Sequence, residues 1–78
     1  MNNEVLLRLV IVRNKKIIEA YLDDRLSFKE NFVYLEQLAK EDLSHAIIYD
    51  PAKKIFLDEN IPIREYHIRC FMLLELFG

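Results

Sequence analysis

The chain has 78 residues, which allows one domain spanning residues 1–78, and its 11 Lys and Arg against 13 Asp and Glu give a net charge of −2. Nucleic-acid binders usually carry a basic excess, so this balance argues against a nucleic-acid partner. A single Cys and a single Gly exclude a disulfide framework, a Cys-rich zinc site and a Gly-rich phosphate loop.

The N-terminal residues lack the features of a secretion signal. Met1 to Glu4 contains no basic residue, and Arg8 interrupts the apolar run that follows. No other run approaches the roughly 18 apolar residues of a membrane span. We therefore expect a cytoplasmic protein with no membrane insertion.

The first half of the chain predicts a hairpin. Residues 5–12 are rich in β-branched side chains and read as a strand, and residues 16–22 read as a second one. The turn between them contains Asn14, a residue type that tolerates positive φ, so we expect Asn14 to supply the tight turn. These features predict an antiparallel N-terminal hairpin.

A helix follows the hairpin. Ser27 and Glu30 match the S-x-x-E capping box, in which each side chain binds the backbone N–H of the other residue. Behind the box, apolar residues recur at helical spacing, which predicts a helix from residue 28 to about residue 40 with one buried face. The residues of this stripe are Phe28, Phe32, Leu35 and Ala39.

The second half reads as three further strands. They are expected at residues 46–49, 55–57 and 71–77, with a helical turn within residues 64–68. The order β-β-α-β-β-β predicts an α+β fold, in which one helix packs across one face of a mixed four- to five-stranded sheet. The last strand should return parallel to the first. Among small folds, this arrangement is the β-grasp.

Strand alternation predicts an apolar surface on the face of the sheet that the helix leaves open. Arg8 should face water, so Leu6 and Val10 share its side of the first strand. Glu75 should also face water, which places Phe71, Leu73 and Phe77 outward on the last strand. An apolar patch on adjacent strands exceeds the usual scatter of exposed residues and predicts a protein-binding patch.

Residues that could support catalysis are more simply explained by structure. His45 and His67 have only Cys70 as a further soft ligand, fewer than a metal site needs. The acidic pairs at residues 23–24 and 58–59 lie in predicted turns, where Asp binds backbone groups. Two dibasic turns, at residues 15–16 and 53–54, suit solubility. We therefore expect no catalytic, cofactor or metal site, and no enzyme.

The order and spacing of the second half resemble the ubiquitin-like superfamily. The matching segments are Ile47-Ile48-Tyr49, Phe56-Leu57-Asp58-Glu59, the loop Ile63-x-x-Tyr66-x-Ile68 and a final alternating strand. With the hairpin and the capped helix, the resemblance covers almost the whole chain. It implies that the Tyr66 hydroxyl binds backbone in its loop. It also implies that Ile47 points inward and Ile48 outward, which adds Ile48 to the protein-binding patch.

Within this superfamily, the size resembles the small bacterial YukD/EsaB-type proteins, which are associated with type VII secretion. This implies a non-catalytic, cytoplasmic protein-binding module whose open sheet face binds a protein partner or forms a homodimer. A ubiquitin-like modifier or sulfur carrier acting through its C-terminal carboxylate is one alternative. However, Phe77 stands where such proteins have the first Gly of a Gly-Gly end. A small structural subunit of an enzyme complex is the other alternative.

Overall fold

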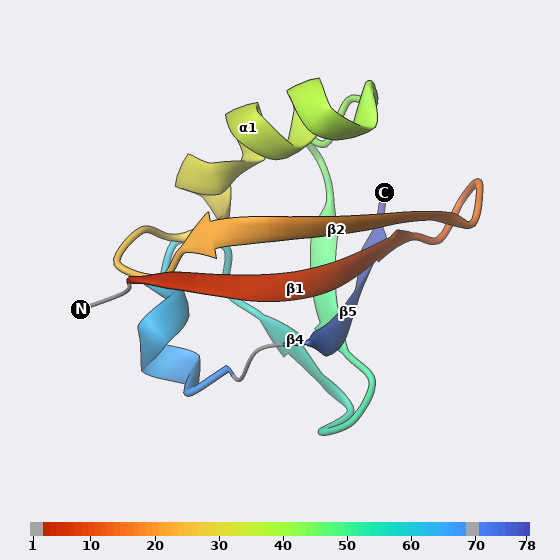
Figure 1. Cartoon of the computed structure of the whole chain (residues 1–78). Coiled ribbons are helices and arrows are strands. Elements are labelled where there is room, and N and C mark those ends of the chain that lie inside the picture. The colour runs from red at the N-terminus through yellow and green to blue at the C-terminus, as the bar shows by residue number, and fades with distance from the viewer. Residues whose placement is uncertain (1–2, 69–70) are drawn as a thin grey trace.

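One helix lies across a mixed five-stranded sheet in the computed structural model, which describes residues 3–68 and 71–78 (Figure 1). The elements follow the predicted order, with a short 3-10 helix, η1, before the last strand. Their bounds are β1 (Glu4–Ile11), β2 (Lys16–Asp23), α1 (Phe28–Ala39), β3 (Ile47–Asp50), β4 (Ile55–Leu57), η1 (Ile63–Tyr66) and β5 (Met72–Phe77).

The sheet has the strand order β2-β1-β5-β3-β4. The central pair, β1 and β5, is parallel, and the other neighbouring pairs are antiparallel. A parallel pair needs a long crossover connection, and here the segment that contains α1, β3 and β4 supplies it. The predicted α+β fold, with its last strand returning beside the first, is therefore confirmed.

In the turn of each hairpin, a lysine adopts the left-handed conformation. Lys15 adopts the left-handed conformation, with φ of 58°, so the prediction that Asn14 takes this position is wrong. Asn14 instead fixes the turn with its side chain, because its Oδ1 accepts a hydrogen bond from the Lys16 N–H. Lys54 has the same φ at the end of the β3–β4 turn. With no glycine in either turn, a lysine occupies the position that glycine would adopt most easily.

Helix α1 begins at the predicted capping box. The Ser27 Oγ accepts from the Glu30 N–H at 3.1 Å, and the Glu30 Oε1 accepts from the Ser27 N–H at 3.0 Å. The helix ends at Ala39, one residue earlier than predicted, with Lys40 in the left-handed conformation as its C-cap. The Lys16 ammonium donates a hydrogen bond to the Ala39 carbonyl, so a β2 side chain also caps the helix.

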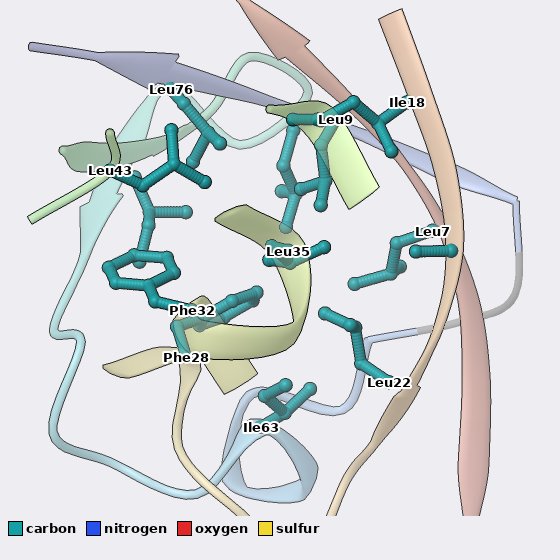
Figure 2. Packing of buried hydrophobic residues seen from close by; sticks show 14 of the residues in the cluster. Leu7, Leu9, Ile18, Leu22, Phe28, Phe32, Leu35, Leu43, Ile63 and Leu76 are labelled. Carbon is teal, nitrogen blue, oxygen red and sulfur yellow. The ribbon is translucent and has the colours of Figure 1, made fainter. Parts of the chain in front are cut away.

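The core lies between α1 and the face of the sheet turned toward it (Figure 2). The helix contributes its predicted stripe, and alternate residues of the strands meet it, so burial follows the two periods of helix and strand. Leu43 and Ile63 close the core from the loops. The residues with no exposed surface at all are Leu7, Leu9, Leu22, Phe28, Leu35 and Leu74.

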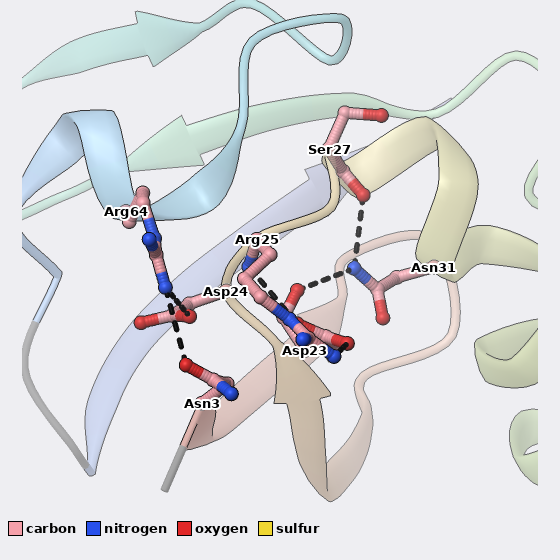
Figure 3. A network of polar contacts seen from close by, with 7 residues as sticks. All are labelled: Asn3, Asp23, Asp24, Arg25, Ser27, Asn31 and Arg64. Atoms are coloured by element: carbon pink, nitrogen blue, oxygen red, sulfur yellow. Dashed lines mark hydrogen bonds and ion pairs between the residues drawn. The ribbon is translucent and has the colours of Figure 1, made fainter. Parts of the chain in front are cut away.

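A polar network holds the corner where β1 begins and β2 ends (Figure 3). The Arg25 guanidinium donates to both carboxylate oxygens of Asp23, and the Asn31 amide donates to the Asp23 and Ser27 carbonyls. These bonds join β2 to the start of α1. The side-chain hydrogen bond from Arg25, followed by that from its backbone, lowers the pKa of Asp23 to about 2.

The same network ties η1 to the start of the chain. The Arg64 guanidinium donates to the side chains of Asp24 and Asn3 (Figure 3). Backbone bonds run alongside, since the Arg64 N–H donates to the Asp24 carbonyl and the Ile63 N–H donates to the Leu26 carbonyl. The segment before β5 is thus anchored to the loop that precedes the helix.

Candidate protein-binding surface

The face of the sheet turned away from α1 is the candidate binding surface, and all five strands contribute to it. We call it the open face and define it by strand alternation and pairing. Its residues are Glu4, Leu6, Arg8 and Val10 on β1; Ile17, Glu19, Tyr21 and Asp23 on β2; Leu73, Glu75 and Phe77 on β5; Ile47 and Tyr49 on β3; and Phe56 on β4.

Four of the predicted patch residues lie on the open face. Arg8 is exposed, and its neighbours along β1, Leu6 and Val10, are partly exposed. Leu73 is directly paired with Arg8 and keeps 43% of its surface exposed. The predicted alternation of β1 and β5 therefore agrees with the structure. It could be predicted because a charged residue in each strand marks the side that faces water.

Phe71 is exposed, as predicted, but strand alternation does not fix its side. It precedes β5 in a left-handed conformation, with φ of 67°, and its N–H donates to the Leu6 carbonyl. The residue is 64% exposed. Phe71 is therefore an exposed aromatic residue beside the open face and does not belong to its strand ladder.

The assignment of Ile48 to the patch is wrong. Ile48 is 1% exposed, and it pairs with two buried residues, Leu57 on β4 and Leu76 on β5. Directly paired residues share a face, so Ile48 must point toward the helix. Its neighbour Ile47, expected inside, is 54% exposed and lies on the open face. One residue of error reverses every side chain of a strand.

Three aromatic residues form the other half of the open face; Phe77 was expected to point outward, whereas Tyr49 and Phe56 were not placed there from the sequence. Tyr49 pairs directly with Phe56, and their ring centroids are 4.9 Å apart. Phe77 approaches the same tyrosine edge-on at 6.0 Å. The cluster follows from the pairing of β3 with β4 and β5. To predict it from the sequence, one must first know which residues of β3 face away from the helix. Aromatic contacts of this geometry add to the energy of burial.

The open face is apolar at its centre and acidic overall. Arg8 forms an ion pair with Glu19 on β2, at 3.7 Å between Nε and Oε1. Glu75 lies between Val10 on β1 and Tyr49 on β3, and it is only partly exposed. The charged residues of the face are Arg8 against Glu4, Glu19 and Glu75, and Asp23, which is paired with Arg25 of the following turn. An apolar surface with excess carboxylates favours a complementary partner surface with cations.

Tyr66 stabilises the loop that follows β4, in the role that the resemblance implies. Its hydroxyl accepts a hydrogen bond from the Asp58 N–H at 2.7 Å and lies 3.2 Å from the Asp58 carbonyl, to which it donates. The Asp58 carboxylate in turn accepts from the Asn60 N–H. Tyr66 and Asp58 therefore serve to stabilise this loop.

His45 and His67 belong to no cluster of possible metal ligands within the described residues. Over residues 3–68 and 71–78, no three His, Cys, Asp or Glu side chains come together as metal ligands would. His67 adopts a left-handed conformation at the end of η1, and its side chain is exposed. The pairing of His67 with Cys70 concerns a residue outside the described part of the chain. No helix in that part is long and apolar enough to cross a membrane.

His45 lines a small cavity of about 110 Å³ at the end of β5. The cavity is formed largely by apolar side chains, including Leu43 and Leu76, with Arg13 at its edge. Arg13 is already bound to the Glu41 carboxylate at 2.9 Å and to the Asp42 carbonyl. The polar groups here stabilise the loop between α1 and β3.

Comparison with solved structures defines the fold. No protein-family model matches the sequence, and the search of curated proteins finds no match. The C-terminal ubiquitin-like domain of mouse tubulin-specific chaperone e superposes with a TM-score of 0.71 at 18% identity, over 96% of this chain and 86% of that one. The ubiquitin-like domain of yeast Ddi1 gives 0.71 at 14% identity, over 97% and 90%. The chain therefore has a ubiquitin-like β-grasp fold.

Proposed function

We propose that this chain is a non-catalytic module that binds a protein partner through its open face. The observation that supports this most strongly is that every strand of the open face carries exposed or partly exposed apolar side chains, from Ile17 on β2 to Phe56 on β4, both 65% exposed. An apolar surface of this extent on one sheet face is a mark of an interaction site. Both solved structures compared above are ubiquitin-like domains of larger proteins, which agrees with a binding role.

A site-specific photocrosslinker at Phe56 tests the proposal in extract of the source cells. Phe56 lies on the open face, and Val33, which is 64% exposed on the outside of α1, provides the control position. We expect a defined protein adduct from position 56, identified by mass spectrometry, and none from position 33. The adduct should disappear when Leu73→Asp is added, because the charge would have to be desolvated on binding. Adducts from position 33 alone would contradict the proposal.

We further propose that the protein is a cytoplasmic accessory component of a bacterial type VII secretion system. The support is the resemblance in size and segment order to the YukD/EsaB-type proteins. The genomic neighbourhood provides the sharpest test, since genes for a secretion ATPase and its substrates should lie beside this one. Neighbouring genes for a multisubunit enzyme would favour instead the role of a small structural subunit.

The alternative is a ubiquitin-like modifier or sulfur carrier, which would act through its C-terminal carboxylate. Phe77 pairs with Ile47 in the sheet and packs near Tyr49, whereas activating enzymes accept a narrow glycine tail. We therefore expect no adenylate or thioester at Gly78 when the chain is incubated with an adenylating enzyme and ATP. A thioester-linked product in mass spectrometry would favour the carrier.

A further inference from the structure

We propose that the cavity at the end of β5 receives one branched aliphatic side chain, of the size of leucine, from the protein that covers the open face. This inference rests on the proposed function and names a residue class that the partner must present. Four features of the cavity carry it: its volume, its apolar lining, the pairing of the charges at its rim and its position beside the open face.

The cavity has room for one side chain. Its volume is about 110 Å³, whereas pockets for drug-sized ligands begin at roughly 300 Å³. An apolar cavity of about 150 Å³ binds benzene, so this smaller one suits a group with fewer carbon atoms, such as the four-carbon side chain of leucine. A side chain carried by a bound partner needs no more space than this.

The lining is apolar and held in place by the core. Its most buried residues are Ile11, Leu43 and Leu76, each 2% exposed and each part of the core cluster. Ala46 lines the cavity with no more than a methyl group, which leaves space that a larger residue would fill. Because packed core residues hold these walls, the cavity exists before binding, and its occupant pays little for ordering it.

The charged groups at the rim already have partners within the chain. The Arg13 guanidinium donates to the Glu41 carboxylate and to the Asp42 carbonyl. The Asp42 carboxylate accepts a hydrogen bond from the Ser44 N–H. A charged ligand would have to give up its water for groups that are already paired, at a cost in free energy. The rim therefore favours an uncharged, apolar occupant.

Phe77 connects the cavity with the open face. It contributes to the cavity lining, and it also belongs to the open face, where its ring centroid lies 6.0 Å from that of Tyr49. Ile47 pairs directly with Phe77 and is 54% exposed on the same face. A partner that covers Phe77 and Ile47 therefore reaches the cavity with a neighbouring residue. Binding energy at interfaces is concentrated in a few anchor side chains that fill such pockets.

Two capped amino acids test the inference by backbone amide NMR. N-acetyl-leucine methylamide carries the aliphatic side chain, and N-acetyl-glycine methylamide lacks it. At up to about 100 mM, we expect the leucine compound to shift the amides of Leu43, Ala46 and Leu76 and to bind at least about tenfold more tightly, as for one buried leucine. Ala46→Leu should fill the cavity and abolish these shifts. The control Ala52→Leu makes the same change in the exposed β3–β4 turn and should preserve them.

The partner itself provides the second measurement. Ala46→Leu should lower the yield of the photoadduct at position 56 at least about fivefold, and Ala52→Leu should leave it unchanged, because the anchor loses its pocket. If the leucine compound binds but Ala46→Leu leaves the adduct unchanged, the cavity takes a free small molecule and the inference is wrong. Should Ala46→Leu fail to fold, Ala46→Val makes the same comparison with a smaller side chain.

Three further outcomes would overturn the inference. They are equal binding of the two compounds, amide shifts away from the cavity, and no binding of the leucine compound. None of them decides the proposed function, because the photoadduct at Phe56 and its loss in Leu73→Asp are measured without either compound. An adduct that depends on Leu73 but not on Ala46 would retain protein binding at the open face and exclude the anchor in the cavity.

Discussion

At the scale of single residues, polar side chains fix the turns of a chain whose one glycine is its last residue. The buried Asp50 carboxylate accepts from the Ala52 and Lys53 N–H groups. Asp23 and Asp58 bind backbone N–H groups two residues ahead in the same way. These bonds are local, so the prediction that the acidic pairs serve turns could be made from residue type alone. The Tyr66 contact is different, because it joins residues eight positions apart.

Replacing Tyr66 by Phe should destabilise the domain by about 1 kcal/mol. The change removes the hydroxyl that binds both backbone groups of Asp58 and leaves the ring in place. Urea unfolding followed by circular dichroism measures the loss. Tyr34→Phe is the matched control, because the Tyr34 hydroxyl is exposed on α1 and makes no hydrogen bond within the described residues. An equal loss in both variants would contradict the role of the Asp58 contact.

The Asp23–Arg25 pair predicts a defined acid sensitivity. The pKa of Asp23 is lowered from an ordinary 3.8 to about 2, chiefly by the Arg25 side chain. A carboxylate with a depressed pKa in the folded state stabilises the fold above its unfolded pKa, and that stability is lost as pH falls. The melting temperature should therefore fall between about pH 4 and pH 2, and Asp23→Asn should flatten this dependence. Glu65→Gln should keep the wild-type slope.

At the scale of secondary structure, the buried side of an element could be predicted from the sequence only where several apolar residues or a charged residue distinguish its two sides. The helix had four apolar residues at regular spacing and a capping box, so its start was predicted to the residue. In β1 and β5, a charged residue within a long apolar run marked the exposed side. In β3, the four residues Ile47–Asp50 contain two adjacent isoleucines and give no such mark. Only pairing with β5, which is a tertiary contact, determines that Ile48 is buried.

Removal of the Ser27 hydroxyl tests the helix start. Ser27→Ala should lower the free energy of unfolding by about 1 kcal/mol, because the Glu30 N–H loses its acceptor. The Ser27 side chain is buried, so water replaces that bond poorly. Ser27→Asp is the control, since its carboxylate supplies another acceptor for the same N–H and should keep most of the stability. An unchanged midpoint for Ser27→Ala in urea would mean that the capping box contributes no stability.

Adjacent substitutions in β3 test its corrected alternation. Ile48→Asp places a carboxylate against Leu57 and Leu76 in the core. Its cost of about 4 kcal/mol or more approaches the whole stability of a small domain, so we expect this variant to be unfolded by circular dichroism. Ile47→Asp adds the same charge one position earlier, on the open face, and should remain folded. The reverse outcome would restore the alternation that the sequence resemblance implies.

At the scale of the whole molecule, one face of the sheet forms the core and the other face is exposed. The face toward α1 holds the core that a 78-residue chain needs, since short chains bury a smaller part of their surface. The other face keeps large apolar side chains exposed without any contribution to that core. Part of the apolar surface of a chain that is 53% hydrophobic therefore lies on this face, where a partner can cover it, while Val33, Tyr34 and Leu38 are exposed on α1.

The charge pattern of the open face predicts that the free protein is a monomer in dilute salt. Besides its Asp23–Arg25 pair, each copy brings Glu4, Glu19, Glu75 and Arg8, so face-to-face pairing of two copies would set six further carboxylates against two Arg8 guanidinium groups. Repulsion between the copies would offset the burial of apolar surface. Sedimentation equilibrium between about 1 and 100 µM, the range of micromolar dimers, should give the monomer mass. Glu75→Lys should bring self-association into this range, because the new ammonium can pair with a carboxylate of the second copy. Glu65→Lys makes the same charge change outside the face and should stay monomeric, whereas a dimer of the unmodified chain at low salt would show that apolar burial outweighs the like charges.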